Sequence, residues 1–200
     1  GLARVRNEDD KWGYINKSGE LVIDFQYDSA LDFSGGLAPV KKNSKYGYID
    51  KDGNVAISFI YDSALSHGKE GLAEVSRSGN YGFIDLKGNK VIPLKYSFYG
   101  GVFSEGLAYV NDGYDAYYID TTGKIVIDYP YLINNTRFSE GLTVVKKDNK
   151  YGYIDKEANL VIDFLFDEVN DFKDGLAHVV KDGHHAFINK SGKVIIGNLD

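Results

Sequence analysis

A Gly-Leu dipeptide returns about every 35 residues along this chain of 200 residues, and this spacing constrains the fold more than any single residue does. The intervals between the six glycines are 35, 35, 35, 35 and 34 residues. A fixed period in this range is typical of repeat architectures, in which each repeat buries its apolar face against its neighbours. The sequence therefore predicts a single domain of six repeats, at residues 1–35, 36–70, 71–105, 106–140, 141–174 and 175–200.

Each repeat shows the pattern of a three-stranded antiparallel sheet, as residues 36–70 illustrate. Apolar runs at residues 37–40, 46–49 and 55–59 are separated by polar turn residues. The segment 61–65 is interpreted as a helical turn or an irregular connector to the next repeat. No segment sustains an apolar period of 3.6 residues, so the chain is predicted to be all-β.

The turn between the second and third runs has a recurring composition. Residues 50–53 read Asp-Lys-Asp-Gly, which fits a type I turn closed by a glycine in the left-handed conformation. The fifth repeat has Ala158 in place of this glycine, and we expect a small conformational cost there. Alternating carboxylates before a glycine also occur in calcium loops, but the turns that read Asn-Lys-Ser-Gly, Asp-Leu-Lys-Gly and Asp-Thr-Thr-Gly in other repeats lack the second acid. Turn chemistry is therefore the favoured interpretation.

Small residues recur in register on two of the predicted strands. Alanine occupies Ala3, Ala38, Ala73, Ala108 and Ala177 on the first strand, and the second strand carries Gly13, Gly47, Gly82, Gly152 and Ala186. Such a layer predicts close approach of a neighbouring repeat's backbone or aromatic ring. Three strands per repeat and the absence of a split repeat favour an open, twisted, solenoid-like array, with a closed six-bladed propeller-like ring as the alternative.

The segment Lys11-Trp12-Gly13-Tyr14-Ile15, followed by Asn-Lys-Ser-Gly, resembles the bacterial WG-containing repeat, also called the KWG repeat. The resemblance extends over all six copies, although only the first keeps the tryptophan and the fourth has Ala116 and Tyr117 for the usual aromatic-glycine pair. It implies a β-repeat fold and supplies no catalytic residue.

Composition and charge exclude several classes of function. The net charge of -6 argues against a nucleic-acid or anionic-lipid partner, because such binding needs clustered lysine and arginine. Cysteine is absent, and no apolar run has the length of a membrane span. The chain begins at Gly1 inside a repeat phrase, which indicates a mature or excised segment, and an extracellular or envelope location is favoured over the cytoplasm.

Sequence motifs for catalysis, cofactors and metals are missing. There is no nucleophile elbow, phosphate loop or dinucleotide fingerprint. His184 and His185 are adjacent on a predicted strand and point to opposite faces, which does not suit a shared metal. The acids that precede the repeat glycines are interpreted as solvated turn residues, with a ladder across repeats as the alternative; they are Glu70, Glu105, Glu140 and Asp174.

Tyrosine is concentrated around the fourth repeat, where eight of the 16 tyrosines lie between residues 96 and 131. Five of them are interpreted as additions to the repeat pattern: Tyr99, Tyr109, Tyr114, Tyr117 and Tyr129. Of these, Tyr99, Tyr114 and Tyr129 are the candidate ligand-binding residues, because tyrosine offers a large contact area with a polar tip. Locally irregular core packing is the alternative. We expect a non-enzymatic module that binds a protein or an envelope glycan; a carbohydrate-binding or carbohydrate-active accessory domain and a structural spacer are the alternatives.

Overall fold

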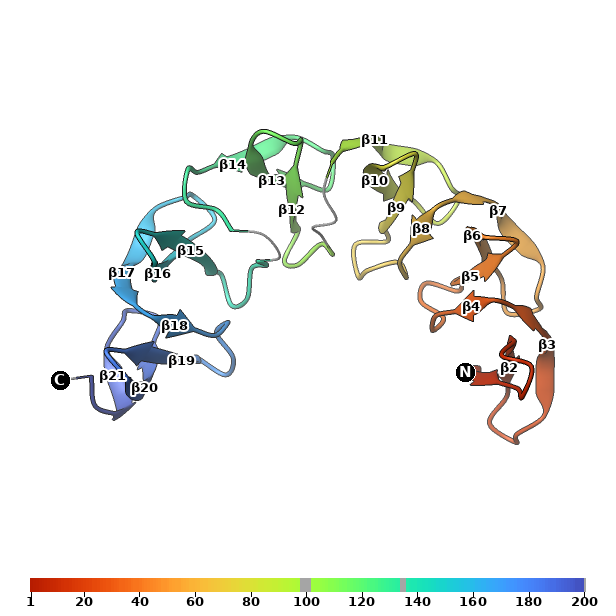
Figure 1. Ribbon diagram of the computed structural model, residues 1–200, viewed down its shortest axis with the longest axis horizontal. Helices are drawn as coiled ribbons and strands as arrows, with labels where there is room; N and C mark the ends of the chain where they lie inside the picture. The colour runs from red at the N-terminus through yellow and green to blue at the C-terminus, as the bar shows by residue number, and fades with distance from the viewer. Residues whose placement is uncertain (98–101, 134–135, 200) are drawn as a thin grey trace. The chain divides into compact units, whose positions relative to one another are not determined.

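The computed structural model describes residues 1–97, 102–133 and 136–199. Strands, turns and irregular segments account for these residues, and no helix occurs among them. The chain divides into an N-terminal half, Gly1–Phe98, and a C-terminal half, Tyr99–Asp200. Each half contains three antiparallel sheets of three or four strands (Figure 1). The predicted all-β array of antiparallel repeats is confirmed.

Three sheets make up the N-terminal half, and within each sheet the strands follow one another in chain order. The first contains β1 (Ala3–Arg6), β2 (Trp12–Ile15) and β3 (Leu21–Tyr27). The second contains β4 (Ser29–Ala30), β5 (Ala38–Lys42), β6 (Lys45–Ile49) and β7 (Val55–Tyr61). The third contains β8 (Ser63–Ala64), β9 (Ala73–Arg77), β10 (Asn80–Ile84) and β11 (Lys90–Tyr96).

The C-terminal half repeats this plan with three further sheets. They comprise β12 (Leu107–Asn111), β13 (Ala116–Asp120) and β14 (Ile125–Asp128); β15 (Thr143–Lys147), β16 (Lys150–Ile154) and β17 (Leu160–Phe166); and β18 (Glu168–Val169), β19 (Leu176–Lys181), β20 (His184–Asn189) and β21 (Val194–Gly197).

Three of the connectors between repeats contain a short strand, β4, β8 or β18, and β8 corrects the prediction of a helical turn or irregular segment at residues 61–65. β8 pairs with β9 of the following repeat, with Ser63 opposite Ser76 and Ala64 opposite Val75. β4 and β18 pair in the same way with β5 and β19. The sequence pattern missed these strands because two residues are too few to show alternation. Each connector strand completes the sheet of the repeat that follows it.

The predicted turn after the second strand is confirmed. The Gly53 amide donates to the Asp50 carbonyl at 3.1 Å, and Gly53 has a φ of 84°. The Asp50 carboxylate accepts hydrogen bonds from the backbone amides of Asp52 and Asn54. These amides hold the pKa of Asp50 below its usual value, together with the Asn54 side chain, which is the largest contributor. Ala158 takes the left-handed conformation with a φ of 64°, as expected of a strained alanine.

The glycines of the second strand face the third strand of their own sheet, not a neighbouring repeat as the sequence suggested. A Cβ atom on Gly47 would lie 2.6 Å from the Ile57 carbonyl oxygen. The cause is a bulge, since Tyr46 pairs with Tyr61 whereas Tyr48 pairs with Ile57, which leaves β7 two residues longer than β6 between these pairs. A Cβ atom on Gly13, Gly82 or Gly152 would likewise lie 2.5 to 2.6 Å from a carbonyl oxygen of the third strand of its own sheet.

The fourth and sixth repeats lack this bulge. Tyr117 and Ala186 stand at the glycine position. Here the second strand pairs with the third strand one residue at a time, as Tyr117 does with Asp128 and Tyr118 with Ile127. A side chain there would occupy the space that the bulged carbonyl needs. Accordingly β14 and β21 are four residues long, whereas the third strands of the other repeats have seven.

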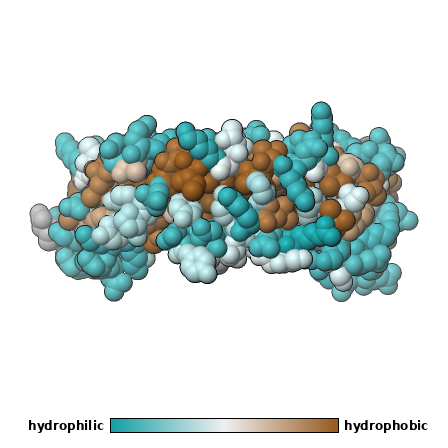
Figure 2. All heavy atoms as spheres, turned by 90° about the horizontal axis from the view of Figure 1, so that it is seen from above, coloured by the Kyte–Doolittle hydropathy of each residue, from teal (hydrophilic) through white to brown (hydrophobic). Residues whose placement is uncertain are grey.

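The hydrophobic core lies between successive repeats in each half. Tyr14 and Ile23 of the first repeat form one cluster with Ala38, Val40 and Ile49 of the second. The first-strand alanine thus packs in the same cluster as a neighbour's aromatic ring, as predicted. Exposed hydrophobic residues occur mainly on the third strands, and on the face in Figure 2 the hydrophobic residues form separate patches among hydrophilic ones.

A buried imidazole replaces one of the core phenylalanines. His67 is 3% exposed, and its ring lies 5.0 Å from that of Tyr48, as Phe33 lies 4.9 Å from Tyr14. The carbonyl of His67 accepts a hydrogen bond from the Ser34 hydroxyl, as the Phe138 carbonyl does from that of Ser104. His67 therefore occupies the phenylalanine position, and burial lowers its pKa below 6.5.

We expect His67→Phe to raise the free energy of unfolding by about 1 kcal/mol at neutral pH, because the phenyl ring has no polar atoms to desolvate. The depressed pKa keeps His67 neutral when folded, so the wild type loses stability as pH falls below about 6.5, where the unfolded imidazole takes up a proton. Urea unfolding at pH 7.5 and pH 5 measures both effects. An equal loss between these pH values in wild type and variant would contradict the assignment.

Candidate functional site

Carboxylates link successive repeats in the C-terminal half. Glu105 accepts a hydrogen bond from the Gly141 amide at 3.1 Å and pairs with Lys156 at 3.1 Å. Glu140 meets Gly175 and Lys190 in the same arrangement one repeat later. Burial acts to raise the pKa of Glu105, but the Lys156 ammonium and the amide lower it below its usual value. Glu105 and Glu140 thus form an inter-repeat clasp, neither the solvated turn that was favoured nor a ladder of acids alone, whereas Asp174 is exposed, as the favoured interpretation expects.

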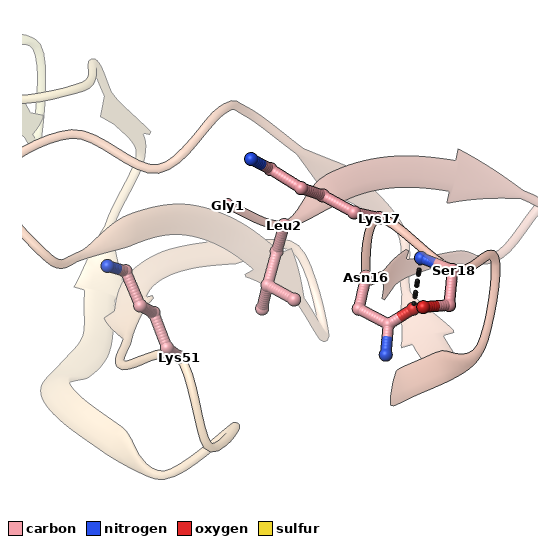
Figure 3. A pocket seen from close by; sticks show the side chains of 6 residues that line it. All are labelled: Gly1, Leu2, Asn16, Lys17, Ser18 and Lys51. Atoms are coloured by element: carbon pink, nitrogen blue, oxygen red, sulfur yellow. Dashed lines mark hydrogen bonds between the residues drawn. The ribbon is translucent and has the colours of Figure 1, made fainter.

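A pocket of about 380 Å³ lies in the N-terminal half beside the first turn (Figure 3). It is lined by Gly1, Leu2, Asn16, Lys17, Ser18 and Lys51. Figure 3 shows the Leu2 side chain between those of Lys17 and Lys51. Lys51 holds the position of the clasp lysines Lys156 and Lys190. We assign no function to this pocket.

A second pocket, of about 450 Å³, lies between the repeats of the C-terminal half and includes Ser104, Phe138, Ser139 and Phe172. Its polar atoms are used in recurring packing contacts, because the Ser104 hydroxyl donates to the Phe138 carbonyl and the Ser139 hydroxyl to the Phe172 carbonyl. This pocket therefore lies where packing contacts recur from repeat to repeat, and we assign no function to it.

A third pocket differs, because its lining departs from the repeat pattern. It has a volume of about 280 Å³ and belongs to the fourth repeat. We call it the Ala116 pocket, and its lining residues are Tyr109, Asn111, Tyr114, Asp115, Ala116, Asp128, Tyr129, Pro130 and Leu132. The segments that supply them are the β12–β13 hairpin, the end of β14 and the residues that follow β14.

The loss of one aromatic ring accounts for the position of the Ala116 pocket. In the second and fifth repeats the residue that begins the second-strand pattern is Tyr46 or Tyr151, opposite Lys41 or Lys146 on the first strand. The same pair of positions in the fourth repeat holds Ala116 opposite Asn111. Alanine leaves unfilled the volume that a tyrosine ring takes in the other copies.

Two carboxylates, Asp115 and Asp128, line the Ala116 pocket, and a third, Asp112, acts with them on the nearby Tyr117 hydroxyl. Asp112 accepts hydrogen bonds from the backbone amides of Asp115 and Tyr114, both at 3.0 Å, and these amides lower its pKa. Partial burial raises the pKa of the Tyr117 hydroxyl, and the charges of Asp112, Asp115 and Asp128 raise it further. The Tyr117 hydroxyl therefore lies in the negative potential of these three carboxylates.

The structure places two of the three candidate tyrosines in this pocket. Tyr114 is 94% exposed at the tip of the hairpin. Tyr129 is half-buried, and its ring lies 5.7 Å from that of Tyr131. It holds the position of Phe59 and Phe164, two residues after the buried third-strand isoleucine, so it belongs to the repeat pattern. Tyr99 lies outside the described residues.

Sequence reasoning misplaced one tyrosine and missed the acids of this site. Tyr109 was counted among the tyrosines added to the pattern, but it is 2% exposed and packs edge-on to Tyr118 in the core. Asp115 and Asp128 gave no motif on their own. A position-by-position comparison of the repeats would have found Asp115, because lysine stands there in the second and fifth copies as Lys45 and Lys150.

Within the described part of the chain, no group of three or more histidines and acids is placed to hold a metal ion. His178 and His185 come together, with the Nε2 atom of one 3.1 Å from the Nδ1 atom of the other. A helix long and apolar enough to cross a membrane is likewise not found among the described residues.

Comparison with solved structures shows the fold alone. The crystal structure of a eukaryotic initiation factor is 11% identical with a TM-score of 0.60, and the match covers 96% of this chain and 62% of that one. Hsv2 of Kluyveromyces lactis is 10% identical with a TM-score of 0.56, over 94% of this chain and 71% of Hsv2. These neighbours are propeller-like. The chain thus spans less than two thirds of the initiation factor.

A search of curated proteins finds no match. The family model described as the WG containing repeat matches residues 12–46, 46–81, 81–114, 118–151 and 151–183. The matched residues include nearly the whole array of sheets, from β2 to the β19–β20 turn. On this evidence the chain belongs to the family of WG-containing repeat proteins.

Proposed function

We propose that this chain is a non-enzymatic binding module that presents the Ala116 pocket to a ligand on a protein or a cell-envelope glycan. One observation carries the proposal: the pocket lies where the fourth repeat gives up the ring that fills this position in the second and fifth repeats. Repeat arrays generally serve as extended binding surfaces, and departures confined to one copy fit a binding role. Tyr114 supplies an exposed ring at the pocket, and a ring in this position has little effect on folding stability.

Tyr114→Ala is expected to weaken ligand binding by roughly 5- to 30-fold while leaving the melting temperature unchanged, because the ring is exposed and has few contacts to lose. Glycan and peptide arrays supply the ligand, and titration of wild type and variant supplies the affinities. Val55→Ala, at an exposed residue of the N-terminal half, is the matched control and should bind as wild type. Equal affinity of Tyr114→Ala and wild type would refute the proposed site.

Tyr129→Ala should reduce both binding and stability, unlike Tyr114→Ala. The Tyr129 ring packs on Tyr131 and against a core cluster of the fourth and fifth repeats, so its removal leaves a partly buried void. This variant therefore serves as a test of packing and not as a clean probe of the ligand.

Carbohydrate binding is the second candidate function, and the lining of the pocket favours it. Asn111, Asp115 and Asp128 present hydrogen-bonding side chains to hydroxyl groups beside the rings of Tyr114 and Tyr129. Tyrosine rings also offer an apolar face to a sugar. Selective capture of the protein by neutral oligosaccharides on the glycan array, in a manner lost with Tyr114→Ala, would favour this candidate over a protein partner.

A further inference from the structure

The charges around the Ala116 pocket identify the class of ligand, and this inference rests on the proposed function. In the second and fifth repeats the hairpin between the first two strands carries its own cation over a ring. The Lys41 ammonium lies 5.6 Å from the centre of the Tyr46 ring, and the Lys146 ammonium lies 4.7 Å from that of Tyr151. At these distances the ring quadrupole attracts the cation.

A second lysine of the same hairpins forms an ion pair. Lys45 pairs with Asp62, and Lys150 pairs with Asp167 at 2.6 Å. Each of these hairpins therefore combines an aromatic ring with lysine ammonium groups, one of which pairs with a carboxylate that follows the third strand. The first repeat is similar, because the Arg4 and Arg6 guanidinium groups lie over the ring of Trp12.

The fourth repeat reverses these charges. The positions of Lys41, Lys42 and Lys45 are occupied there by Asn111, Asp112 and Asp115. No lysine or arginine occurs in the sequence between Lys95 and Lys124, although the corresponding hairpin of every other repeat contains at least one. The hairpin keeps the fold of its counterparts but has neither the cation nor the ring.

The emptied position remains suited to a cation. Asp115 and Asp128 line the pocket beside the rings of Tyr109, Tyr114 and Tyr129. The Lys147 ammonium lies 5.0 Å from the centre of the Tyr131 ring, which packs on Tyr129. The carboxylates of Asp112, Asp115 and Asp128 exceed that single charge, so the local field favours a positive ligand.

We infer that the Ala116 pocket binds an organic cation, an alkylammonium or guanidinium group, at the place where the other repeats hold their own lysine or arginine. The volume of about 280 Å³ admits the end of a lysine or arginine side chain or a small free amine. The ligand supplies the charge that the hairpin lacks, with the carboxylates as counter-ions and the tyrosine rings as walls.

The test is a titration of the isotopically labelled chain followed by the backbone amide signals of Gly113, Tyr114 and Ala116. One arm uses n-butylammonium against n-butanol, and the other uses a blocked lysine peptide against the same peptide with Nε-acetyl-lysine. Each neutral control matches its cation in length. The two arms distinguish a free amine from a protein side chain as the source of the cation.

We expect both cations to shift the three signals saturably and the neutral controls to leave them unmoved. The double substitution Asp115→Asn and Asp128→Asn should weaken the binding of both cations on the order of fivefold, because two exposed counter-charges are lost while the shape of the pocket is kept. Raising sodium chloride from about 20 to about 200 mM should weaken them further through screening. Ala116→Tyr should abolish the shifts by filling the pocket, and Asp52→Asn, at an exposed turn carboxylate, should change nothing.

Equal shifts from charged and neutral probes, or affinities unaffected by the double asparagine variant, would overturn the inference. So would an absence of shifts with either cation. The proposed function is tested separately. An array ligand whose binding depends on Tyr114 but not on the two carboxylates would support the binding module and contradict only the inference that the ligand is a cation.

Discussion

Replacing Tyr48 by alanine is expected to lower the free energy of unfolding by about 4 kcal/mol, because the change empties a ring-sized volume in a closed core. Tyr48 is fully buried, and its ring lies 5.0 Å from that of His67. Its hydroxyl donates to the Leu65 carbonyl at 2.8 Å, which holds the connector against the sheet. Tyr48→Phe keeps the ring and removes this hydrogen bond, so it should cost only about 1 kcal/mol.

Urea unfolding of the three proteins measures these differences. The control is Tyr114→Ala, the same substitution at a side chain that is 94% exposed, and its midpoint should match that of wild type. Losses of similar size from Tyr48→Ala and Tyr114→Ala would show that the packing between repeats is not what stabilises the array.

Gly47→Ala should lower the free energy of unfolding by about 3 kcal/mol, although it adds a single methyl group. The new Cβ would lie 2.6 Å from the Ile57 carbonyl oxygen and 3.0 Å from the Phe59 nitrogen. Both atoms belong to the backbone of the bulge, so the overlap is relieved only by moving β7. We expect the amide signals of the second and third repeats to shift together with the loss of stability.

Gly36→Ala is the matched control for this prediction. Gly36 has a φ of 90° but no atom within 4 Å of its notional Cβ, so alanine there carries only the conformational cost of about 1 kcal/mol. If Gly47→Ala proved no more harmful than Gly36→Ala, the bulge would be pliable and steric overlap would not explain the glycine.

The sequence was sufficient to predict features that depend on residues repeated in register. The period gave the number of repeats, and the residues of turn 50–53 gave the left-handed Gly53 that the structure contains. The role of Gly47 was misjudged, because a small residue signals a close approach without saying which segment approaches. Only the register of β6 against β7 identifies that segment as the third strand of the same sheet.

The tyrosine count that led to the candidate site was only partly a valid criterion. Counting tyrosines led to the fourth repeat, yet Tyr109 is a core residue and Tyr129 fills a regular aromatic position. The informative change was an absence, since Ala116 removes a ring and thereby makes a pocket. A missing side chain produces no motif, and it becomes visible only when the copies are compared at positions that the strand pairing makes equivalent.

The connector strands have a consequence for how such a chain lengthens. Because Ser63–Ala64 belongs to the second repeat by sequence but pairs with β9 of the third, the second repeat supplies a strand to the sheet of the third, and β4 and β18 do the same for the sheets of the second and sixth repeats. A tandem duplication of 35 residues therefore yields complete sheets wherever its breakpoint falls within the period. Gene duplication and laboratory recombination can both use any surface turn as a junction, provided that the inserted length is a whole number of periods.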